Sequence, residues 1–195
     1  STYRLQMRGD ECTFADAVAL LDYLDALGVS HVYLSPVLSA TTGSTHGYDV
    51  VDPGTVSESL GGREGLERLS REARARGMGL VVDIVPNHVG VADPRQNAWW
   101  WDVLKHGSGS RYASFFDLDL ADDNGADGRI ALPVLGSDDA VRELTVDRSG
   151  DEPMLAYYDN RFPIAPGTDE GTGEEVHARQ AYRLVAWNSG LIGYR

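Results

Sequence analysis

Apolar residues recur three and four positions apart between residues 14 and 28, where the chain reads FADAVALLDYLDALG. This spacing predicts a helix with one apolar face, and Gly28 is its expected end. Thr13 is the expected N-cap, with Asp16 three residues later as a weak capping box. A second helix is predicted over residues 61–79, with buried positions at Leu66, Leu69 and Ala73.

Three β-favouring runs lie before and between these helices. The runs are STYRLQ at 1–6, SHVYLSPVL at 30–38, closed by Pro36, and LVVDIVP at 80–86. Alternating strands and helices are typical of a parallel sheet in an α/β fold. Both helices lead into the next strand through short turns, whereas long polar segments follow the strands. In such folds the carboxyl ends of the strands carry the chemistry.

The regular alternation stops after His88. Residues 89–176 are rich in Asp, Gly and Pro, with short β-like pieces at 130–136 and 154–159. Their aromatic and apolar content is too high for a disordered linker, so we expect an inserted subdomain. Residues 177–187, HARQAYRLVAW, read as a helix.

The predicted fold is therefore the N-terminal part of a (β/α)8 barrel, with about three strands and a subdomain inserted after the third. A complete barrel takes about 250 residues, more than the 195 present. The expected parts are the first βα units at 1–88, the inserted subdomain at 89–176, and a returning barrel helix, truncated, at 177–195.

Composition narrows the possible partners. With 42% hydrophobic residues the chain can bury an ordinary core, and a net charge of −13 argues against a nucleic-acid-binding surface. Cys12 is the single cysteine, which excludes an intrachain disulfide and fits a reducing compartment. No apolar run approaches the roughly 20 residues of a membrane span, and the sequence shows no charged-then-apolar leader. We expect a soluble, cytoplasmic protein that binds neither membrane nor nucleic acid.

Polar residues interrupt the third predicted strand. Side chains alternate along a strand, so Val81, Asp83, Val85 and Asn87 share one side. A carboxylate facing apolar helices would be costly, whereas in a barrel interior Asp83 could pair with a cation from a neighbouring strand. Asn87 and His88 would then lie at the mouth. The alternative is a structural Asp83 and a His88 satisfied by backbone groups in a turn.

A second polar cluster follows the second predicted strand, in GSTHGYDVVD at 43–52. Tyr48 offers a flat apolar face and a hydroxyl, a combination that suits a sugar ring. His46 and Asp49 could supply directional hydrogen bonds to sugar hydroxyls. The alternative is a tyrosine packed over the barrel rim, with Asp49 capping a turn.

At these residues the chain resembles the α-amylase superfamily of retaining glycoside hydrolases and transglycosylases, whose first conserved region is similar to DIVPNH. Within it, the chain resembles the maltooligosyl trehalose synthase family along nearly its whole length. The stretches that carry this resemblance are STYRLQ, GVSHVYLSPVLSATTGSTHGYDVVD, GGREGLERL, GMGLVVDIVPNHVGV, WWWDVLKHG and YYDNRFPIAPGT.

This resemblance implies an intramolecular transglucosylation. The reducing-end α-1,4 linkage of a maltooligosaccharide, an α-1,4-glucan, would be rearranged to an α,α-1,1 linkage, leaving a terminal trehalose unit. Retaining chemistry of this kind uses a nucleophilic carboxylate and an acid/base carboxyl group about 5–5.5 Å apart. A closed pocket with little water would favour transfer over hydrolysis. The implied pathway partner is a hydrolase that releases trehalose, and no cofactor is implied.

The resemblance also implies roles in substrate binding. His46 and Tyr48 match the family positions that line the sugar subsite next to the scissile bond, with Tyr48 stacked on the ring. Asp49 matches the polar residue beside them. His88 matches a histidine that bonds a hydroxyl of the same sugar, and Asn87 accompanies it.

Asp83 matches an interior carboxylate that supports the site by orienting an arginine near the nucleophile. Trp99 to Trp101 match the family's excursion after the third strand, where packing and sugar contact both remain open. The family's nucleophile, acid/base glutamate and third carboxylate lie on later strands, and nothing after Leu191 resembles the R-x-D strand end. We therefore assign no catalytic residue and expect the isolated chain to be inactive.

Other chemistries lack their motifs. There is no G-x-S-x-G, H-E-x-x-H, G-x-G-x-x-G or P-loop, and the five histidines have no metal-ligand spacing. DNGADG at 123–128 resembles a calcium loop, but position 12 of that frame is Val134 rather than Glu. We expect no metal site. Two alternatives to the mutase stay open: another glucan hydrolase or transferase of the superfamily, and a non-catalytic glucan-binding module.

Overall fold

Three parallel strands form the first sheet of the computed structural model, which describes residues 1–194. They are β1 (Thr2–Leu5), β2 (His31–Leu34) and β5 (Gly79–Val82), in the order β1-β2-β5. The pairing places Arg4, Tyr33 and Val81 opposite one another across the sheet. The strands predicted in 1–6 and 30–38 are confirmed.

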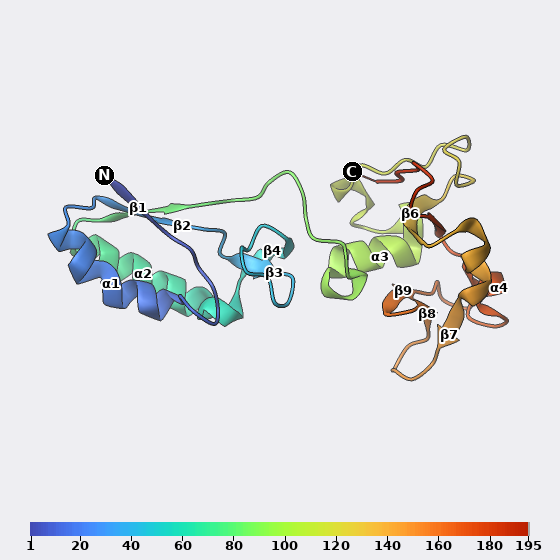
Figure 1. Ribbon diagram of the computed structural model, residues 1–195, viewed down its shortest axis with the longest axis horizontal. Helices are drawn as coiled ribbons and strands as arrows, with labels where there is room; N and C mark the ends of the chain where they lie inside the picture. The colour runs from blue at the N-terminus through green and yellow to red at the C-terminus, as the bar shows by residue number, and fades with distance from the viewer. Residues whose placement is uncertain (195) are drawn as a thin grey trace. The chain divides into compact units, whose positions relative to one another are not determined.

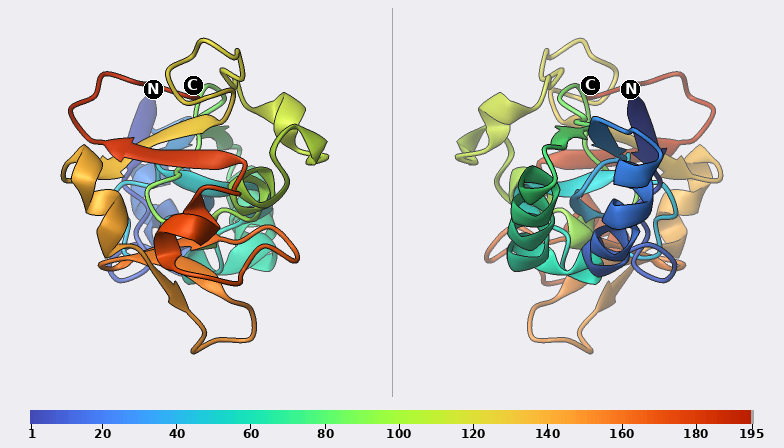
Figure 2. Two further views of the ribbon diagram at one scale, coloured as in Figure 1. Left: turned by 90° about the vertical axis from the view of Figure 1, so that its right-hand side faces the viewer. Right: turned by 90° about the vertical axis from the view of Figure 1, so that its left-hand side faces the viewer.

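Two helices lie side by side on one face of this sheet (Figures 1 and 2). They are α1 (Phe14–Ala26) and α2 (Gly62–Ala75), and both were predicted. The Thr13–Asp16 capping box is formed in full, and Gly28 adopts the left-handed conformation, φ +80°, that ends the helix. The core between helices and sheet is made chiefly of Leu5, Phe14, Leu21, Leu24, Val32, Leu34 and Leu69.

The third strand is shorter than predicted. It ends at Val82, although the Asp83 amide still donates to the Leu34 carbonyl at 3.0 Å. Proline cannot donate to a ladder and restricts the residue before it, so Pro86 opposes strand geometry at this end. Ile84 is 65% exposed, and the interval from Asp83 to Pro86 is irregular chain rather than strand.

A small antiparallel hairpin, absent from the prediction, follows β2. It pairs β3 (Leu38–Ala40) with β4 (Val50–Val56) and encloses the loop of residues 41–49. A 3-10 turn, η1 (Glu58–Leu60), leads from β4 into α2. The loop of residues 41–49, which contains most of the polar cluster, is thus held at both ends by backbone pairing.

The chain divides into two compact units, Ser1–Gly90 and a second that begins at Val91. The second contains two small sheets: β6 (Ile130–Leu135) beside β10 (Tyr182–Ala186), and the antiparallel order β7 (Thr145–Asp147), β8 (Met154–Tyr157), β9 (Asn160–Pro163). Its helices are α3 (Ala98–His106) and α4 (Gly173–His177). Short 3-10 turns are η2 (Pro94–Gln96), η3 (Gly107–Gly109), η4 (Ala113–Phe115) and η5 (Asp138–Glu143).

The helix predicted over 177–187 is wrong. The helix α4 ends at His177, and Tyr182–Ala186 forms strand β10, which pairs in parallel with β6 inside the second unit. A returning barrel helix at 177–195 is therefore not found, and Arg195, its last position, lies outside the described residues. Tyr182 and Leu184 are buried on either side of the half-buried Arg183, which is the period of a strand, and Val185 and Ala186 are both buried after them.

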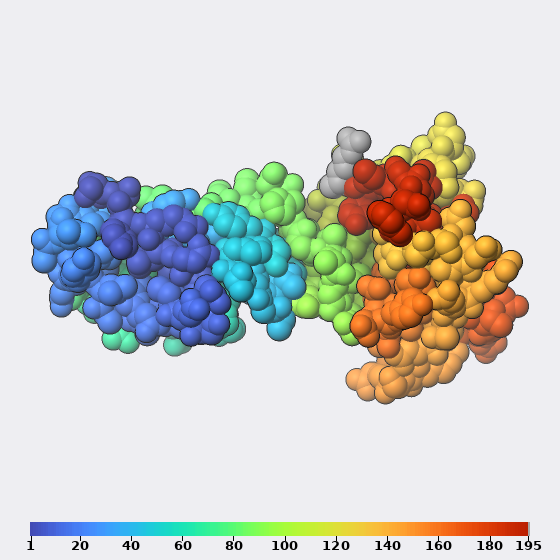
Figure 3. All heavy atoms as spheres, in the orientation of Figure 1, coloured from blue at the N-terminus to red at the C-terminus, as the bar shows by residue number. Residues whose placement is uncertain are grey.

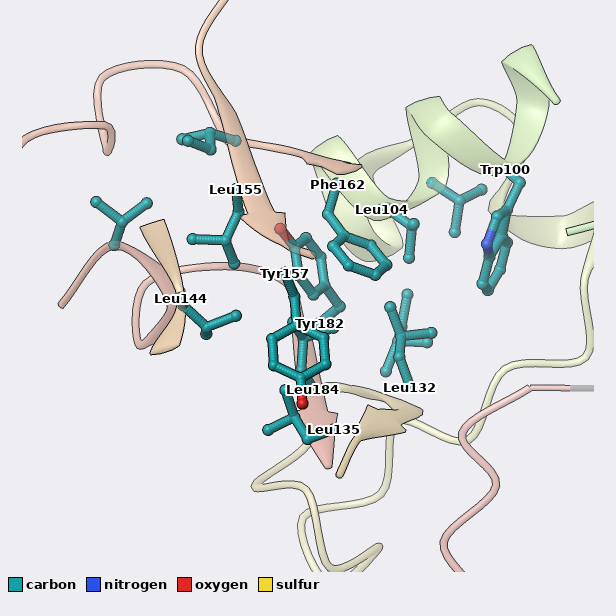
Figure 4. Close-up of a cluster of buried hydrophobic side chains, with 14 of the residues drawn as sticks. Trp100, Leu104, Leu132, Leu135, Leu144, Leu155, Tyr157, Phe162, Tyr182 and Leu184 are labelled. Carbon is teal, nitrogen blue, oxygen red and sulfur yellow. The ribbon is translucent and has the colours of Figure 1, made fainter. Parts of the chain in front are cut away.

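Aromatic and leucine side chains fill the core of the second unit (Figure 4). Trp100 from α3, Leu155 and Tyr157 from β8, and Tyr182 from β10 all contribute to this cluster. Each buried side chain of this size contributes roughly 1.5–3 kcal/mol relative to an exposed one. Within residues 1–194 no helix has both the length and the apolar character needed to cross a membrane.

Candidate functional site

The Asp83 carboxylate is the centre of a hydrogen-bonded cluster at the end of β5. Its Oδ2 accepts the Tyr48 hydroxyl at 2.6 Å and the Tyr33 hydroxyl at 2.8 Å. Tyr33 lies on β2 between the buried residues Val32 and Leu34, so Asp83 is on the face of the sheet opposite the helices. The prediction that Asp83 avoids the helix-facing side is confirmed.

The expected cation partner of Asp83 is replaced by the two tyrosine hydroxyls. Arg4 on β1 donates to the Tyr48 hydroxyl at 3.4 Å, and its guanidinium lies 5.6 Å from the centre of the Tyr33 ring. Within residues 1–194 no salt bridge joins Asp83 to a cation. Hydrogen bonds from Tyr48 and then Tyr33, with the nearby Arg4 charge, hold the pKa of Asp83 below its usual value. The Asp83 carboxylate in turn raises the pKa of Tyr33.

The loop of residues 41–49 is folded by its own polar side chains. The Ser44 hydroxyl donates to Asp49 Oδ1 at 2.5 Å, and the Asp49 carbonyl accepts the Thr41 amide at 3.0 Å. Gly47 has φ +75°, and a Cβ there would lie 2.9 Å from the Pro36 carbonyl oxygen, so glycine is required. Asp49 therefore closes this loop. The segment, light blue to cyan, is on the surface of the first unit in Figure 3.

His46 keeps one ring nitrogen available. Its Nδ1 accepts the Tyr48 backbone N–H at 3.0 Å, which leaves the proton of the neutral ring on Nε2. The His46 side chain is 53% exposed, and its ring lies 6.0 Å from that of Tyr48 at an interplanar angle of 27°. A donor is thus presented to solvent beside a partly exposed aromatic ring.

His88 joins the two loops. Its Nε2 lies 3.1 Å from the Tyr48 carbonyl oxygen, and its Nδ1 lies 3.1 Å from Asn87 Oδ1. A carbonyl can only accept, so Nε2 carries a proton in this contact. These contacts fit both interpretations of His88, as a residue satisfied by backbone and as part of a sugar site.

The structure therefore brings all six predicted residues into one neighbourhood. Tyr48 contacts His46, Asp83 and His88, while Asp49 and Asn87 reach the cluster through His46 and His88. A hydroxyl-lined cavity of about 270 Å³ lies beside the same loop, with Thr41 and Ser44 among its lining residues. Among residues 1–194 no three His, Cys, Asp or Glu side chains form a metal-binding group.

Two members of the cluster, Arg4 and Tyr33, were not predicted. Both alternate with buried residues of their strands, Leu5 for Arg4 and Val32 and Leu34 for Tyr33. The same period-two argument that placed Asp83 on the face away from the helices could have found them. The signal was present but lay in strands without a recognisable motif.

Of the three tryptophans, Trp100 is buried, whereas Trp99 and Trp101 are half-buried. Trp100 is buried, 4.7 Å from the ring of Tyr194 and 5.0 Å from that of Phe116, so it packs in the core. Trp99 is half-buried and stacks on Tyr112 at 5.6 Å.

The cluster offers what a neutral polyol needs. A tyrosine ring, 37% exposed, has its hydroxyl already engaged with Asp83 and Arg4, so its face rather than its hydroxyl is available. Beside it, the Nε2–H of His46 can donate to a hydroxyl. Sugar sites combine an apolar platform with a few fixed polar groups in this way.

Comparisons with known proteins identify the family of this chain. The sequence model of the family described as "Alpha amylase, catalytic domain" matches residues 15–135. A Mycobacterium tuberculosis (strain H37Rv) protein described as "Putative maltooligosyl trehalose synthase" is 63% identical over 199 residues, covering 100% of this chain and 25% of that protein. An "Intracellular maltogenic amylase" of Bacillus subtilis (strain 168) is 39% identical over 107 residues, covering 53% of this chain and 17% of the amylase.

Solved structures give the same picture. Maltooligosyltrehalose synthase from Arthrobacter ramosus has a TM-score of 0.91 and 52% identity, covering 100% of this chain and 25% of that one. A hypothetical maltooligosyl trehalose synthase from Sulfolobus tokodaii has a TM-score of 0.84 and 42% identity, with 100% and 26% covered. The chain thus spans about a quarter of the length of these relatives.

Proposed function

This chain belongs to the family of α-amylase catalytic domains, and from that premise we propose that it is the N-terminal part of a maltooligosyl trehalose synthase. The proposed reaction converts the reducing-end α-1,4 linkage of a maltooligosaccharide into an α,α-1,1 linkage. The support is 63% identity along the whole chain to a relative of that name, and 52% identity to a solved one.

The proposed contribution of this chain is a glucose subsite. The observation that carries it is the 2.6 Å hydrogen bond from the Tyr48 hydroxyl to Asp83, which ties the loop after β2 to the end of β5. With its hydroxyl anchored there and its carbonyl 3.1 Å from His88 Nε2, the Tyr48 ring is fixed before any sugar arrives. Such preorganisation lowers the entropy cost of binding.

Each predicted residue has a role in this subsite. The Tyr48 ring stacks on the sugar, and the His46 Nε2–H donates to a hydroxyl. Asp49 shapes the loop that carries both, since its side chain accepts from Ser44 and its carbonyl from Thr41. His88 and Asn87 hold the second loop, and His88 also contacts the sugar if its ring turns. Asp83 acts as a positioning residue.

The reaction itself needs groups outside the roles proposed here. A carboxylate attacks the anomeric carbon as the α-1,4 bond to the leaving oxygen breaks, and an acid protonates that oxygen. The released glucose must then turn within the pocket so that its anomeric hydroxyl attacks the same carbon, displaces the carboxylate and gives its proton back to the acid/base group. We propose that these carboxyl groups lie in the three quarters of the relatives' length that this chain does not span, and that a trehalose-releasing hydrolase uses the product in the cytoplasm.

A second candidate is a glucan-hydrolysing amylase, favoured by the 39% identity to an intracellular maltogenic amylase. That likeness covers 53% of the chain, whereas the synthase likeness covers all of it. The stretches STYRLQ and FPIAPGT, which the synthase family shares, also favour the mutase.

Binding of maltotriose to the 195-residue chain tests the proposed subsite. We expect weak, saturable binding by NMR titration, and at least a roughly fivefold loss in Tyr48→Ala, because a stacked ring is worth about 1 kcal/mol or more. Tyr23→Ala is the matched control, since Tyr23 is 63% exposed on α1 and outside the cluster. Equal affinity of the two variants would contradict the subsite.

The reaction is tested in a polypeptide of the relatives' full length that contains this chain. Incubation with maltopentaose is expected to remove reducing ends without releasing glucose as the main product. Accumulation of shorter reducing sugars would instead identify the amylase.

A further inference from the structure

A cavity of about 530 Å³ in the second unit shares no residue with the proposed sugar site. It opens beside β10 and α4 and is lined by residues of both, together with the loop before β6. Its volume lies within the roughly 300–1,000 Å³ range of pockets that hold small organic ligands. The polar groups that line it decide which ligand chemistry it suits.

Two arginines line this cavity, and the Arg129 guanidinium also donates to the Ala126 and His177 carbonyls at 3.4 Å. Arg129 and Arg183 both line it, and each lies near Asp127, at 3.5 Å and 2.8 Å respectively. One carboxylate therefore serves two arginines, leaving one positive charge in excess among the three groups. Repulsion from Arg183, after desolvation, lowers the pKa of Arg129.

A buried histidine adds a third donor. His177 lines the cavity and is 5% exposed, and its Nε2 accepts the Leu184 backbone N–H at 2.9 Å. The proton of the neutral ring is then on Nδ1, which makes no hydrogen bond within residues 1–194. Burial, followed by the Arg129 and Arg183 charges, lowers the pKa of His177 to about 4. The ring is thus a neutral donor in a positive local field.

The negatively charged residues that also line the cavity are exposed to solvent. Asp138 and Glu174 also line the cavity, but both are exposed and lie in the first turns of η5 and α4. Water and salt screen exposed carboxylates strongly, whereas the Arg129 side chain is 22% exposed and less screened. Five of the lining residues have larger apolar side chains: Leu135, Val141, Leu184, Val185 and Leu191.

We propose that this cavity binds the phosphate monoester of a small polar molecule, with Arg129, Arg183 and the Nδ1–H of His177 as its donors. Planar guanidinium forks match phosphate oxygens, and the three terminal oxygens of a phosphate monoester can accept from all three donors. The cavity is larger than inorganic phosphate needs, so the ester group occupies the remaining volume. This inference is independent of the proposed sugar site.

The test measures binding of glucose 6-phosphate to the chain by calorimetry, with inorganic phosphate and glucose as further arms. Saturable binding of the monoester is expected, with weaker binding of inorganic phosphate and none of glucose at this cavity. Arg183→Met should weaken binding about tenfold or more, because it removes charge-assisted hydrogen bonds. Arg148→Met is the matched control, since Arg148 is paired with Asp169 at 2.6 Å away from the cavity.

The Asp127→Asn substitution should change the affinity for the monoester in the opposite direction to Arg183→Met. Asp127 is exposed, with φ +56°, a conformation that asparagine tolerates, so the fold should be kept. Removing its charge frees both arginines, and binding of the monoester should tighten several-fold. In the native chain, binding should also raise the pKa of His177 from about 4, read from its ring resonances by NMR.

The proposal is overturned if no saturable binding is seen, if Arg183→Met binds like Arg148→Met, or if Asp127→Asn binds more weakly. Inorganic phosphate binding as tightly as the monoester would show that the ester group makes no contact, and the ligand class would be wrong. Should Arg183→Met fail to fold, the Asp127→Asn affinity and the His177 pKa decide the question.

Discussion

Tyr48 is held by three different parts of the first unit, and this determines what its side chain can do. Its hydroxyl donates to Asp83, its backbone N–H donates to His46, and its carbonyl lies beside His88 Nε2. The polar atoms of Tyr48 are therefore occupied, and the ring face is the part left to contact a ligand. The Tyr48 ring is therefore an apolar surface that is held in one orientation.

Tyr48→Phe should raise the pKa of Asp83, because the Tyr48 hydroxyl is the largest cause of its depression. Tyr33→Phe, which removes the second hydrogen bond, should raise it less. A carboxyl group with a depressed pKa adds stability above its unfolded value, about 3.9, and that stability is lost as the pH falls through the folded value. Carboxyl ¹³C shifts followed from pH 6 to pH 2 measure both changes. Equal titration in the two variants would contradict the order.

His177 makes the second unit sensitive to mild acid. Its pKa is about 4 in the folded chain and about 6.5 when unfolded, so the unfolded state binds more protons between these values. Stability should therefore fall as the pH drops from 6.5 to 4, by up to about 3 kcal/mol. Urea unfolding at several pH values should show a smaller fall in His177→Gln. His106→Gln, at an exposed position, is the control, and an equal effect there would refute this assignment.

Site residues were predictable where several polar side chains occurred close together in or directly after an otherwise apolar strand. Asp83, the His46–Asp49 loop and the Asn87–His88 pair interrupt strands or follow them, and the structure brings them together. Arg4 and Tyr33 were not predicted, because each is the only residue of its strand that joins the cluster and neither belongs to a recognisable motif. A lone polar residue on a strand most often faces solvent, and its partners depend on residues about 30 to 80 positions away, which pattern alone does not specify.

Secondary-structure elements were predicted best where the apolar residues followed a single spacing. The helix α1 has a cap, an apolar stripe and a glycine end that all agree, and its predicted bounds are nearly those observed. The stretch 177–187 has conflicting signals, since Ala and Leu favour a helix while Tyr182, Leu184 and Ala186 alternate. Residues 182–186 form a strand because pairing with β6 satisfies their backbone hydrogen bonds and buries Tyr182 and Leu184.

Gly173→Ala should disrupt the junction between α4 and β7. A Cβ at Gly173 would lie 2.0 Å from the Leu144 carbonyl oxygen and 2.7 Å from the Thr145 nitrogen, so the backbone itself must move. Overpacking of this kind costs about 3 kcal/mol or more in the free energy of unfolding. Gly109→Ala is the control, with open space around its Cβ, and should change stability by less than about 1 kcal/mol. Similar urea midpoints for the two variants would contradict this, because they would show that α4 can move without a loss of stability.

At the scale of the whole molecule, the parallel sheet and helices of the first unit were predictable, whereas its β3–β4 hairpin and the topology of the second unit were not. The repeated strand and helix of residues 1–90 impose one parallel sheet with helices on a face. The second unit is built from short strands whose partners are far apart, such as β6 and β10, and from a core that gathers Trp100, Leu155 and Tyr182. No local period encodes such pairings, so composition indicated a folded subdomain without indicating its topology.

The 195-residue polypeptide alone should not rearrange a maltooligosaccharide. Retaining transfer needs a nucleophile and an acid/base group about 5–5.5 Å apart across the scissile bond. Near Tyr48, Asp49 already accepts from Ser44, and Asp83 accepts from two tyrosines with a depressed pKa that opposes its use as an acid. Incubation with maltopentaose should therefore yield no non-reducing product by chromatography, while maltotriose still binds. Formation of such a product, abolished by Asp83→Asn, would mean that this cluster performs catalysis itself.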